Sequence, residues 1–565
     1  MRVLGAGLGV LSEMGRMRGT YRSLVVVALA ILVGLGTYFA WVGDDAFIAF
    51  RYGRNLAEGY GFVFNPTDSA PVEGFTQLAW ILIVAGVEWL GVEVVAGTRM
   101  IELGITVGLV WYWSRVAVDG PLGIGVVGAT VGLFVLVTSP GLVVWSTGGL
   151  GTILFALAVF ACAERLLGAG LASDSQGSVW SACLAAAALT FVRFDGLYFA
   201  VVIVASSGIA AWLAGHRRLA LVALLAGASA AVATGIQSLW RWSYFGDWVP
   251  NTVQAKGGMS VKTIERGLDY LVSSWMTVPL LCVALGLAIG YGWRHRRTEP
   301  ALVVIAGILL GTSLFGLLVG GDFMPMGRFF VPALPLVALV IGRACRDLFN
   351  ERGRMPAGLA ATGALALSVP ALFDLSLFPE ELREENTFRW GFPQYQSEAS
   401  FLQGVAKRAE DWGLFGRALA LHADPEDSLV RGAVGAVSYY SNVTIYDRYG
   451  LTDREVALSA KHDPESIAMP GHDSGVVEGF FEDRNPTWVG GGLLLGQQPG
   501  MAEYEAAHEA ARAGLIDLFI VGAEDGFPED GILVMRRFLP SAETANPASV
   551  GLTEAGAFKD SSDPE

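Results

Sequence analysis

Long apolar runs recur through the first two thirds of this 565-residue sequence, and each is about as long as a membrane-spanning helix. A helix needs about 20 apolar residues to cross the hydrocarbon core of a bilayer. The runs lie at 24–42, 75–92, 98–113, 121–138, 148–167, 179–214, 219–240, 269–292, 300–320, 329–347 and 357–378. Because the run at 179–214 is long enough for two helices, we expect a polytopic α-helical membrane protein with roughly 10–12 transmembrane helices.

Charge divides the chain at Phe378, where the last apolar run ends. Residues 1–378 carry 24 basic and 21 acidic side chains, a net charge of +3, whereas residues 379–565 carry 14 and 32, a net charge of −18. An apolar, weakly basic part followed by an acidic, polar part is typical of a membrane domain joined to one domain in water. A composition that is 53% hydrophobic and 16% charged excludes an ordinary soluble enzyme. The sequence carries no basic nucleic-acid footprint, so we expect no nucleic-acid partner.

We expect three parts along the chain. Residues 1–378 form the membrane domain, residues 379–540 form a C-terminal extracytoplasmic α/β domain, and residues 541–565 form a disordered tail. The second part mixes a helical pattern at 398–414 with strand-like runs at 431–440, 515–521 and 531–535. The last part is polar and rich in small residues, a composition that cannot bury a core.

Basic residues between the apolar runs predict the orientation, because Lys and Arg are retained on the cytoplasmic side. Such residues gather at the N-terminus and at 216–218, 294–297 and 343–354. We therefore expect a multi-pass protein of the plasma membrane with a cytoplasmic N-terminus. Alternation of the spans then gives the segments on the outer face: 43–74, 241–268, 321–328 and everything after 378. Between 75 and 215 the rule does not fix the orientation.

The first outer segment contains two adjacent carboxylates, Asp44 and Asp45, followed by Arg51 and Arg54 on a predicted helix. A carboxylate at a membrane surface can act as a general base, and arginines can hold a phosphate. In the structural alternative, the aspartates cap the helix and pair with the arginines. Residue types and spacing leave both interpretations open.

Two further outer segments add polar groups. The segment at 241–268 contains Tyr244, Asp247 and Asn251, with Lys256 behind them, and the segment at 321–328 contains Asp322 and Arg328. The aromatic residues are typical of an interfacial belt, although they could also hold a sugar. Equally, the basic side chains could contact lipid headgroups or a substrate phosphate.

Charged residues occur at two other places. Arg193 and Asp195 interrupt the run at 179–214 and mark either a functional site or the turn between two spans. In the polar part, His462-Asp463 and His472-Asp473 stand ten residues apart, which is not a recognised metal-ligand spacing. We therefore assign no metal ligand, no cofactor is certain, and a divalent cation remains an open question.

The sequence has no Walker-type phosphate loop and no long cytoplasmic domain, so it offers no place for ATP-driven transport. A transferase that works on the outer face needs a donor already carried by the membrane. A sugar on a polyprenyl phosphate meets that requirement.

Several motifs resemble those of a known enzyme class. Gly43-Asp44-Asp45-Ala46-Phe47-Ile48, Val63-Phe64-Asn65-Pro66 and Val72-Glu73-Gly74-Phe75-Thr76 resemble the first outer loop of GT-C glycosyltransferases, which use lipid-phosphate sugars. Three more resemble the actinobacterial terminal β-(1→2)-arabinofuranosyltransferase group: Tyr244-Phe245-Gly246-Asp247, Gly320-Gly321-Asp322-Phe323 and Gly450-Leu451-Thr452-Asp453.

The resemblance implies the GT-C fold and transfer of D-arabinofuranose from a decaprenyl phosphate donor to a cell-envelope glycan. It places the catalytic aspartate at Asp44 or Asp45, whose neighbour orients it or binds a metal. The residues expected to bind the donor phosphate are Arg51, Arg54, Lys256 and Arg328. Those expected to bind substrate are Glu73, Tyr244, Asp247, Asn251 and Asp322.

Some alternatives stay open at this point. The sugar could be mannose or another one, and the chain could instead be a flippase or transporter of lipid-linked sugars, or a receptor anchored by its spans. The resemblance suggests net retention, whereas a single base suggests inversion. The polar part could hold the acceptor or shield the site. A cavity that brings together Asp44, Asp45, Asp322 and Arg328 would favour the transferase.

Overall fold

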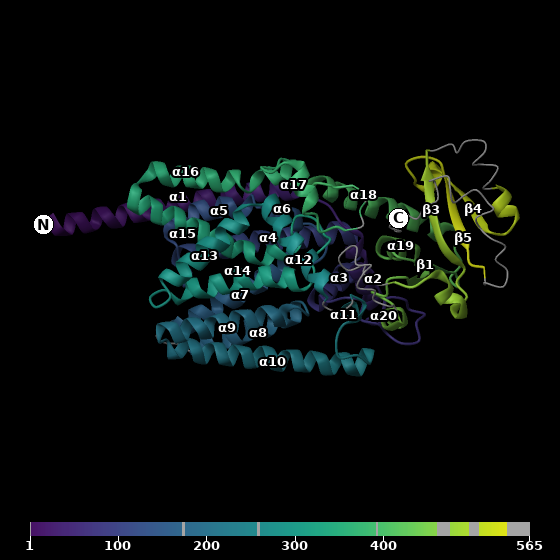
Figure 1. Ribbon diagram of the computed structural model, residues 1–565, viewed down its shortest axis with the longest axis horizontal. Coiled ribbons are helices and arrows are strands. Elements are labelled where there is room, and N and C mark those ends of the chain that lie inside the picture. The colour runs from purple at the N-terminus through teal and green to yellow at the C-terminus, as the bar shows by residue number, and fades with distance from the viewer. Residues whose placement is uncertain are drawn as a thin grey trace.

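The computed structural model describes residues 2–171, 176–256, 260–390, 392, 394–459, 475–496 and 508–539. It consists of a long bundle of helices followed by a part that contains a sheet (Figure 1). The two histidine–aspartate pairs at 462–463 and 472–473, and the predicted tail at 541–565, lie outside the described residues.

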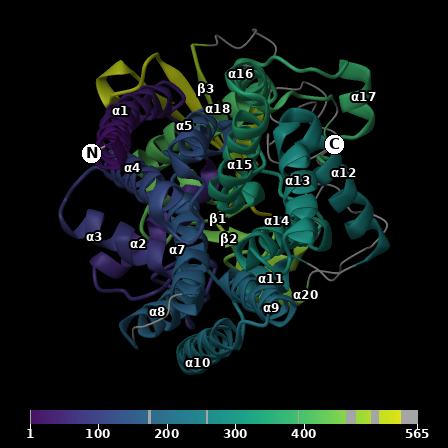
Figure 2. The same ribbon diagram turned by 90° about the vertical axis from the view of Figure 1, so that its left-hand side faces the viewer.

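The first part of the chain is helical. Its elements are α1 (Arg2–Tyr38), α2 (Asp44–Ala57), α3 (Leu78–Trp89), α4 (Val94–Asp119), α5 (Gly125–Val137), α6 (Pro140–Trp145), α7 (Thr152–Leu171), α8 (Gln176–Val192), α9 (Gly196–Ala214), α10 (Arg217–Phe245), α11 (Asn251–Ala255), α12 (Val261–Thr277), α13 (Leu280–Arg294), α14 (Pro300–Leu318), η1 (Arg328–Ala333), α15 (Leu334–Arg352), α16 (Arg354–Ala366) and η2 (Val369–Phe373). Viewed from the end that holds the N-terminus, they form a bundle (Figure 2).

Within the described residues, eight helices are long and apolar enough to cross a membrane, and a bent pair, α12 with α13, makes a ninth. Three shorter apolar helices, α3, α5 and α8, accompany them. The predicted class, a polytopic helical membrane protein with a further α/β part, is confirmed. The run at 179–214 forms two helices, α8 and α9, with Arg193 and Asp195 at the turn between them.

Three predicted spans are wrong in their extent. The run at 121–138 forms α5, which has only 13 residues. The run at 75–92 forms α3, whose 12 residues reach only about 18 Å, because the chain turns at Gly91 with a positive φ. Figure 1 places α3 beside α2, at the end of the bundle nearest the sheet. The run at 269–292 is broken before Leu280, where Pro279 follows Val278 and the two helices meet at 101°.

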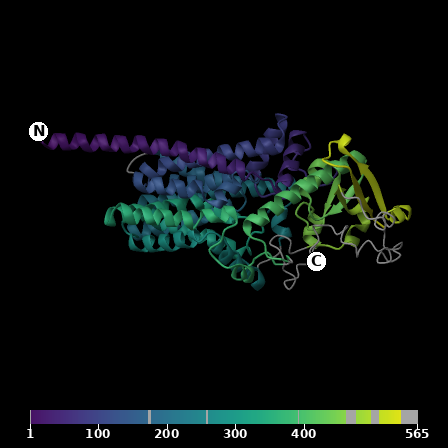
Figure 3. The same ribbon diagram turned by 90° about the horizontal axis from the view of Figure 1, so that it is seen from above.

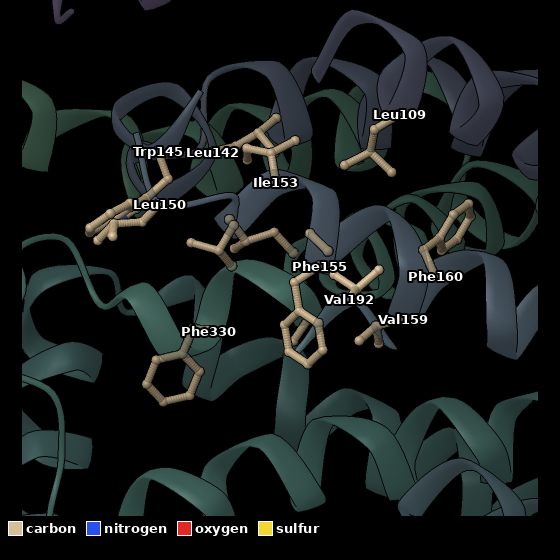
Figure 4. Packing of buried hydrophobic residues seen from close by; sticks show 14 of the residues in the cluster. Leu109, Leu142, Trp145, Leu150, Ile153, Phe155, Val159, Phe160, Val192 and Phe330 are labelled. Carbon is tan, nitrogen blue, oxygen red and sulfur yellow. The ribbon is translucent and has the colours of Figure 1, made fainter. Parts of the chain in front are cut away.

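The core of the bundle surrounds α7. Leu109 of α4, Trp145 of α6 and Phe330 of η1 pack around its buried side chains, including Ile153 and Phe160 (Figure 4). A helix that buries apolar residues on most of its faces belongs at the centre of a bundle. The indole nitrogen of Trp145 also donates to the Pro325 carbonyl oxygen at 3.1 Å, which ties α6 to the predicted outer segment at 321–328.

The second part is an α/β structure. Its elements are α17 (Glu380–Glu385), α18 (Glu398–His422), β1 (Ser428–Arg431), α19 (Gly435–Ser441), β2 (Thr444–Asp447), α20 (Arg454–Ser459), η3 (Glu478–Arg484), β3 (Trp488–Leu495), β4 (Ile516–Val521), η4 (Ala523–Asp525) and β5 (Gly531–Arg537). The strand order is β2-β1-β3-β5-β4. Strand β1 pairs in parallel with β2 and β3, while β5 runs antiparallel to β3 and β4.

One predicted strand in this part is wrong. Arg431, the first residue of the run at 431–440, is the last residue of β1. Residues Gly435–Ser441 form the short helix α19, which packs on α18. The helix predicted at 398–414 and the strands predicted at 515–521 and 531–535 correspond to α18, β4 and β5. Helix α18 runs from the end of the bundle toward the sheet (Figures 1 and 3).

Candidate active site

The two adjacent aspartates of the first outer segment begin α2 and point in different directions. Successive residues on a helix lie about 100° apart, so neighbours cannot share a face. Asp44 shares its face with Phe47, Arg51 and Arg54, which follow at intervals of three or four residues. Asp45 belongs to another face, and the two carboxylates therefore have different surroundings.

Asp44 faces the second part of the chain, where it caps α19. Its carboxylate accepts hydrogen bonds from the backbone N–H groups of Gly435 at 3.0 Å and Ala436 at 2.7 Å. Only a glycine allows this approach, because a Cβ at Gly435 would lie 1.9 Å from the Asp44 carbonyl oxygen. Burial raises the pKa of the Asp44 carboxyl to about 6, and the two N–H groups oppose that rise.

Arg51 and Arg54 hold the other end of the same short helix. The buried Arg51 donates to the carbonyl oxygens of Ser438, of Val443 at 3.0 Å and of Phe64 at 2.6 Å. Arg54 donates to the Tyr439 carbonyl oxygen at 2.7 Å and lies 4.5 Å from the centre of that ring. A carboxylate at the N-terminus of α19 and guanidinium groups at its C-terminus both match the polarity of the helix.

Asp45 faces a cavity at the end of the bundle nearest the sheet. The cavity has an empty volume of about 780 Å³. It is lined by Asp45, Ile48, Gly74, Phe75, Thr76, Gln77, Leu150, Arg193, Thr252, Lys256, Asp322, Phe323, Arg328 and Leu451. These residues come from all three predicted outer segments, from the turn between α8 and α9, and from the second part of the chain.

Three basic side chains face this cavity. Arg328 forms a two-point ion pair with Asp322 at 2.6 and 2.7 Å, and Arg193 pairs with Asp195 at 2.9 Å. Lys256 lies within electrostatic range of Asp45 and Arg328. Within the described part of the chain, no hydrogen bond or ion pair engages the carboxylate of Asp45 or the ammonium of Lys256. Both groups are therefore available to a substrate.

A smaller, largely aromatic pocket adjoins the cavity and shares two of its basic residues. It is lined by Thr152, Phe155, Arg193, Asp195, Phe199, Phe315, Arg328, Phe329 and Pro332. Arg193 and Arg328 thus stand where a polar cavity meets an apolar one. A molecule with a charged head and an apolar chain matches that junction.

Glu73 and Asn251 lie behind the residues that line the cavity. Glu73 forms an ion pair with Arg241 at 2.9 Å, and both side chains are 2% exposed. Asn251 donates its side-chain N–H to the carbonyl oxygens of Gly450 at 2.7 Å and Leu451 at 3.0 Å, and its backbone N–H to the Glu73 carbonyl oxygen. This places Leu451, from the second part, at the cavity wall.

The structure separates the eleven predicted site residues into two sets. It brings together Asp45, Lys256, Asp322 and Arg328 at the cavity. Asp44, Arg51 and Arg54 contact α19, and Glu73 and Asn251 lie behind the wall. The Tyr244 hydroxyl accepts from the Phe62 N–H at 3.0 Å, and Asp247 pairs with Arg454 at 2.8 Å, so neither lines the cavity.

Sequence analysis did not assign Thr76, Gln77, Thr252 or Leu451 to the site. Thr76 and Leu451 lie inside or at the end of motifs that carry the resemblance, and Gln77 directly follows one, so a signal was present for these three. Thr252 directly follows Asn251, which was assigned to the site. Arg193 was recognised as a charged interruption of an apolar run, without a role. Only the folded chain shows that this interruption opens toward the outer segments.

The carboxylates of the cavity do not form a metal site by themselves. Among the described residues, no three His, Cys, Asp or Glu side chains converge as metal ligands. Of the two carboxylates that face the cavity, Asp322 is held by Arg328. The described residues of the cavity do not fit a divalent cation.

Solved structures share this fold. Two crystal structures of ArnT from Cupriavidus metallidurans, one bound to undecaprenyl phosphate and one in the apo state, superpose with TM-scores of 0.50 and 0.51. Both structures are 13% identical to this chain. The superpositions cover 92% and 91% of this chain and 98% of each ArnT chain. The chain thus shares the fold of these two structures, and the predicted fold class is confirmed.

At the level of sequence, a terminal β-(1→2)-arabinofuranosyltransferase of Mycobacterium tuberculosis is 29% identical over 360 residues. The match covers 56% of this chain and 55% of the relative, so it spans about half of that protein. The resemblance predicted from the motifs is confirmed. Residues 402–526 also match a domain family of unknown function, DUF8728.

Titration of Asp44 predicts a pH dependence of stability. Its folded-state pKa, about 6, lies above its ordinary value of 3.8, so the folded protein binds this proton more tightly than the unfolded chain. The contribution of this proton to the free energy of unfolding is complete below about pH 4 and is lost as the pH rises through about 6. Relative to Asp44→Asn, which cannot titrate, we expect the free energy of unfolding of the wild type to rise by about 1 kcal/mol between pH 7 and pH 5. Melting curves of both proteins at both pH values test this, and identical shifts would contradict it.

Proposed function

We propose that this protein is an integral membrane glycosyltransferase that moves a sugar from a polyprenyl phosphate donor to a cell-envelope glycan on the outer face. D-arabinofuranose is the proposed sugar and decaprenyl phosphate the proposed carrier, as the similarity to the arabinofuranosyltransferase supports. The observation that carries the proposal is the cavity, in which one unengaged carboxylate, Asp45, faces three basic side chains.

Basic residues near the predicted cytoplasmic segments support the proposed orientation. Arg18 of α1 pairs with Asp119 of α4 at 3.0 Å, and Arg343 of α15 pairs with Glu299 at 2.6 Å, both near predicted cytoplasmic segments. Basic residues remain on the cytoplasmic side. We therefore place the N-terminus in the cytoplasm of a plasma-membrane protein, and the cavity and residues 379–540 outside. Residues 1–378 form the transferase domain in this proposal.

The reaction joins an acceptor hydroxyl oxygen to the anomeric carbon of the donor sugar. As this bond forms, Asp45 takes the hydroxyl proton, and the bond between the anomeric carbon and the phosphate oxygen breaks. Its electron pair leaves with the polyprenyl phosphate, whose charge Lys256, Arg193 and Arg328 stabilise. Phosphate is a good leaving group, so no acid is required.

The apolar carrier has a place beside these basic residues. Arg193 and Arg328 also line the aromatic pocket that adjoins the cavity, so a phosphate held between them positions the first part of a polyprenyl chain among Phe155, Phe199 and Phe315. Asp322 keeps Arg328 oriented through two hydrogen bonds. Leu451 brings the second part of the chain to the cavity wall, near the proposed acceptor.

The donor phosphate is tested with Lys256→Met. Loss of one charge-assisted contact of about 1.5–3 kcal/mol is expected to weaken donor binding by about 10- to 100-fold. Because no described residue forms a hydrogen bond or ion pair with this ammonium, stability should change little. The measurement is release of polyprenyl phosphate from decaprenyl phosphoarabinose as donor concentration is varied, with purified protein and an arabinan acceptor.

Lys262→Met is the matched control, since it removes a lysine six residues further along that does not line the cavity. Equal donor KM values for the two variants would contradict a phosphate contact by Lys256. Absence of turnover by the wild type with decaprenyl phosphoarabinose, but turnover with another polyprenyl phosphate sugar, would replace arabinose and keep the transferase.

A further inference from the structure

A second cavity lies on the other side of α2, away from Asp45. It has an empty volume of about 1240 Å³. Its lining residues are Ala40, Trp41, Val42, Phe47, Val95, Arg99, Gln403, Ala406, Lys407, Ala409, Glu410, Gly413, Leu414, Arg417 and Tyr440. They come from the segment that follows α1, from α2 and α4, and from α18 and α19. It shares no residue with the cavity that contains Asp45.

The charge in this cavity is mostly positive. Three basic side chains, Arg99, Lys407 and Arg417, face one acid, Glu410. Lys407 is already paired with Asp411 at 3.1 Å, whereas Arg417 lies 4.4 Å from the centre of the Tyr440 ring. The Nε of Arg99 is buried and has no hydrogen-bond partner in the described part of the chain.

Burying a guanidinium N–H without a hydrogen-bond partner is costly in free energy. Arginine is also the side chain best suited to hold a phosphate in two-point contact. Arg99 therefore has the chemistry of an anion-binding side chain, and the acid within electrostatic range of it, Glu93, does not line the cavity. Arg417 lies across the cavity on α18, a helix of the second part, so an anion between these two side chains would be held by both parts of the chain.

The level of the cavity identifies the kind of anion. Arg99 lies near the beginning of α4, whose far end, at Asp119, pairs with Arg18 near the predicted cytoplasmic side. Trp41 and Val42 follow the end of α1. The cavity thus lies where α1 ends and α4 begins, next to α18. In the proposed orientation this is the outer surface of the bilayer. Lipid phosphates occupy that level, together with tryptophan side chains.

We propose that this cavity binds the phosphate of an anionic phospholipid between Arg99 and Arg417. The aromatic and apolar residues of its wall, Trp41, Phe47 and Leu414, contact the glycerol and the first part of the acyl chains. A bound lipid links the spans to α18. This site is separate from the proposed donor site and does not depend on the proposed function.

The test measures lipid binding to the purified full-length protein by native mass spectrometry, with dioleoylphosphatidylglycerol and dioleoylphosphatidylcholine as probes. We expect saturable binding of phosphatidylglycerol that Arg99→Gln weakens at least tenfold. Gln403→Trp, which fills the cavity from an exposed position and keeps both arginines, should weaken it as well. Arg115→Gln is the matched control, because it removes an exposed arginine from the same helix outside the cavity.

A competing titration with inorganic phosphate distinguishes two sources of the anion. Competition would support a site that recognises phosphate alone, from lipid or from water, whereas binding of phosphatidylglycerol without competition would support a lipid. Equal binding of both lipids, or equal loss in Arg99→Gln and Arg115→Gln, would overturn the proposal. So would binding of a neutral arabinan in place of phosphatidylglycerol. Melting curves of each variant establish that it is folded.

Discussion

Asp45→Asn should abolish most of the sugar transfer while leaving the protein folded. A general base contributes about 10²- to 10⁴-fold to the rate, and an amide cannot take the acceptor proton. Because no described residue is bonded to the Asp45 carboxylate, the substitution breaks no internal contact. We therefore expect kcat to fall by at least 10²-fold, with donor KM and melting temperature nearly unchanged, in an assay of polyprenyl phosphate release.

Asp247→Asn provides the comparison for that experiment. Asp247 also belongs to an outer segment, but it pairs with the partly exposed Arg454 and does not line the cavity. Surface ion pairs contribute about 0–1 kcal/mol, so transfer should continue at a rate close to that of the wild type. If Asp45→Asn retained full kcat, Asp45 would not be the base.

Arg51→Met should destabilise the protein far more than it affects donor binding. Removing the buried guanidinium leaves the carbonyl oxygens of Ser438, Val443 and Phe64 without their donor, a loss of about 3–5 kcal/mol by comparison with other buried charged contacts. Thermal melting and limited proteolysis between α18 and β2 measure the effect. Donor KM in the surviving folded fraction should match that of the wild type.

Arg54→Met is the natural control, since Arg54 contacts the same helix but is partly exposed. Its effect on melting should be clearly smaller. If Arg51→Met melted like the wild type and raised the donor KM instead, Arg51 would bind phosphate, as first expected, and would not hold α19.

The apolar runs predicted most of the bundle because membrane helices are specified locally, by length and composition. The errors occur where local signals compete. The run at 75–92 is apolar enough to span, but Gly91 ends α3 too early, and Pro279 divides the run at 269–292. The strand-like pattern at 431–440 forms α19, a short helix whose two ends are both capped by α2.

The site was harder to predict than the fold, because its contacts join distant segments. Gly435, which Asp44 caps, is 391 residues away in sequence, and no local pattern indicates it. The helical period could nevertheless have separated Asp44 from Asp45, since residues 44, 47, 51 and 54 share one face. Arg328 and Lys256, which were expected to bind the donor phosphate, both line the cavity, and their role there stays a prediction.

The edge of the sheet at β2 is covered by a side chain of the first predicted outer segment. Strand β2 is at the edge, and Asn65 accepts from the Ile445 N–H at 3.1 Å and donates to its carbonyl oxygen at 3.0 Å, as a neighbouring strand would. During biosynthesis this contact forms late, because the first segment must wait for residues synthesised 380 positions later. A fragment that began after the last span would fold with this edge unpaired, exposed to other chains and prone to aggregation.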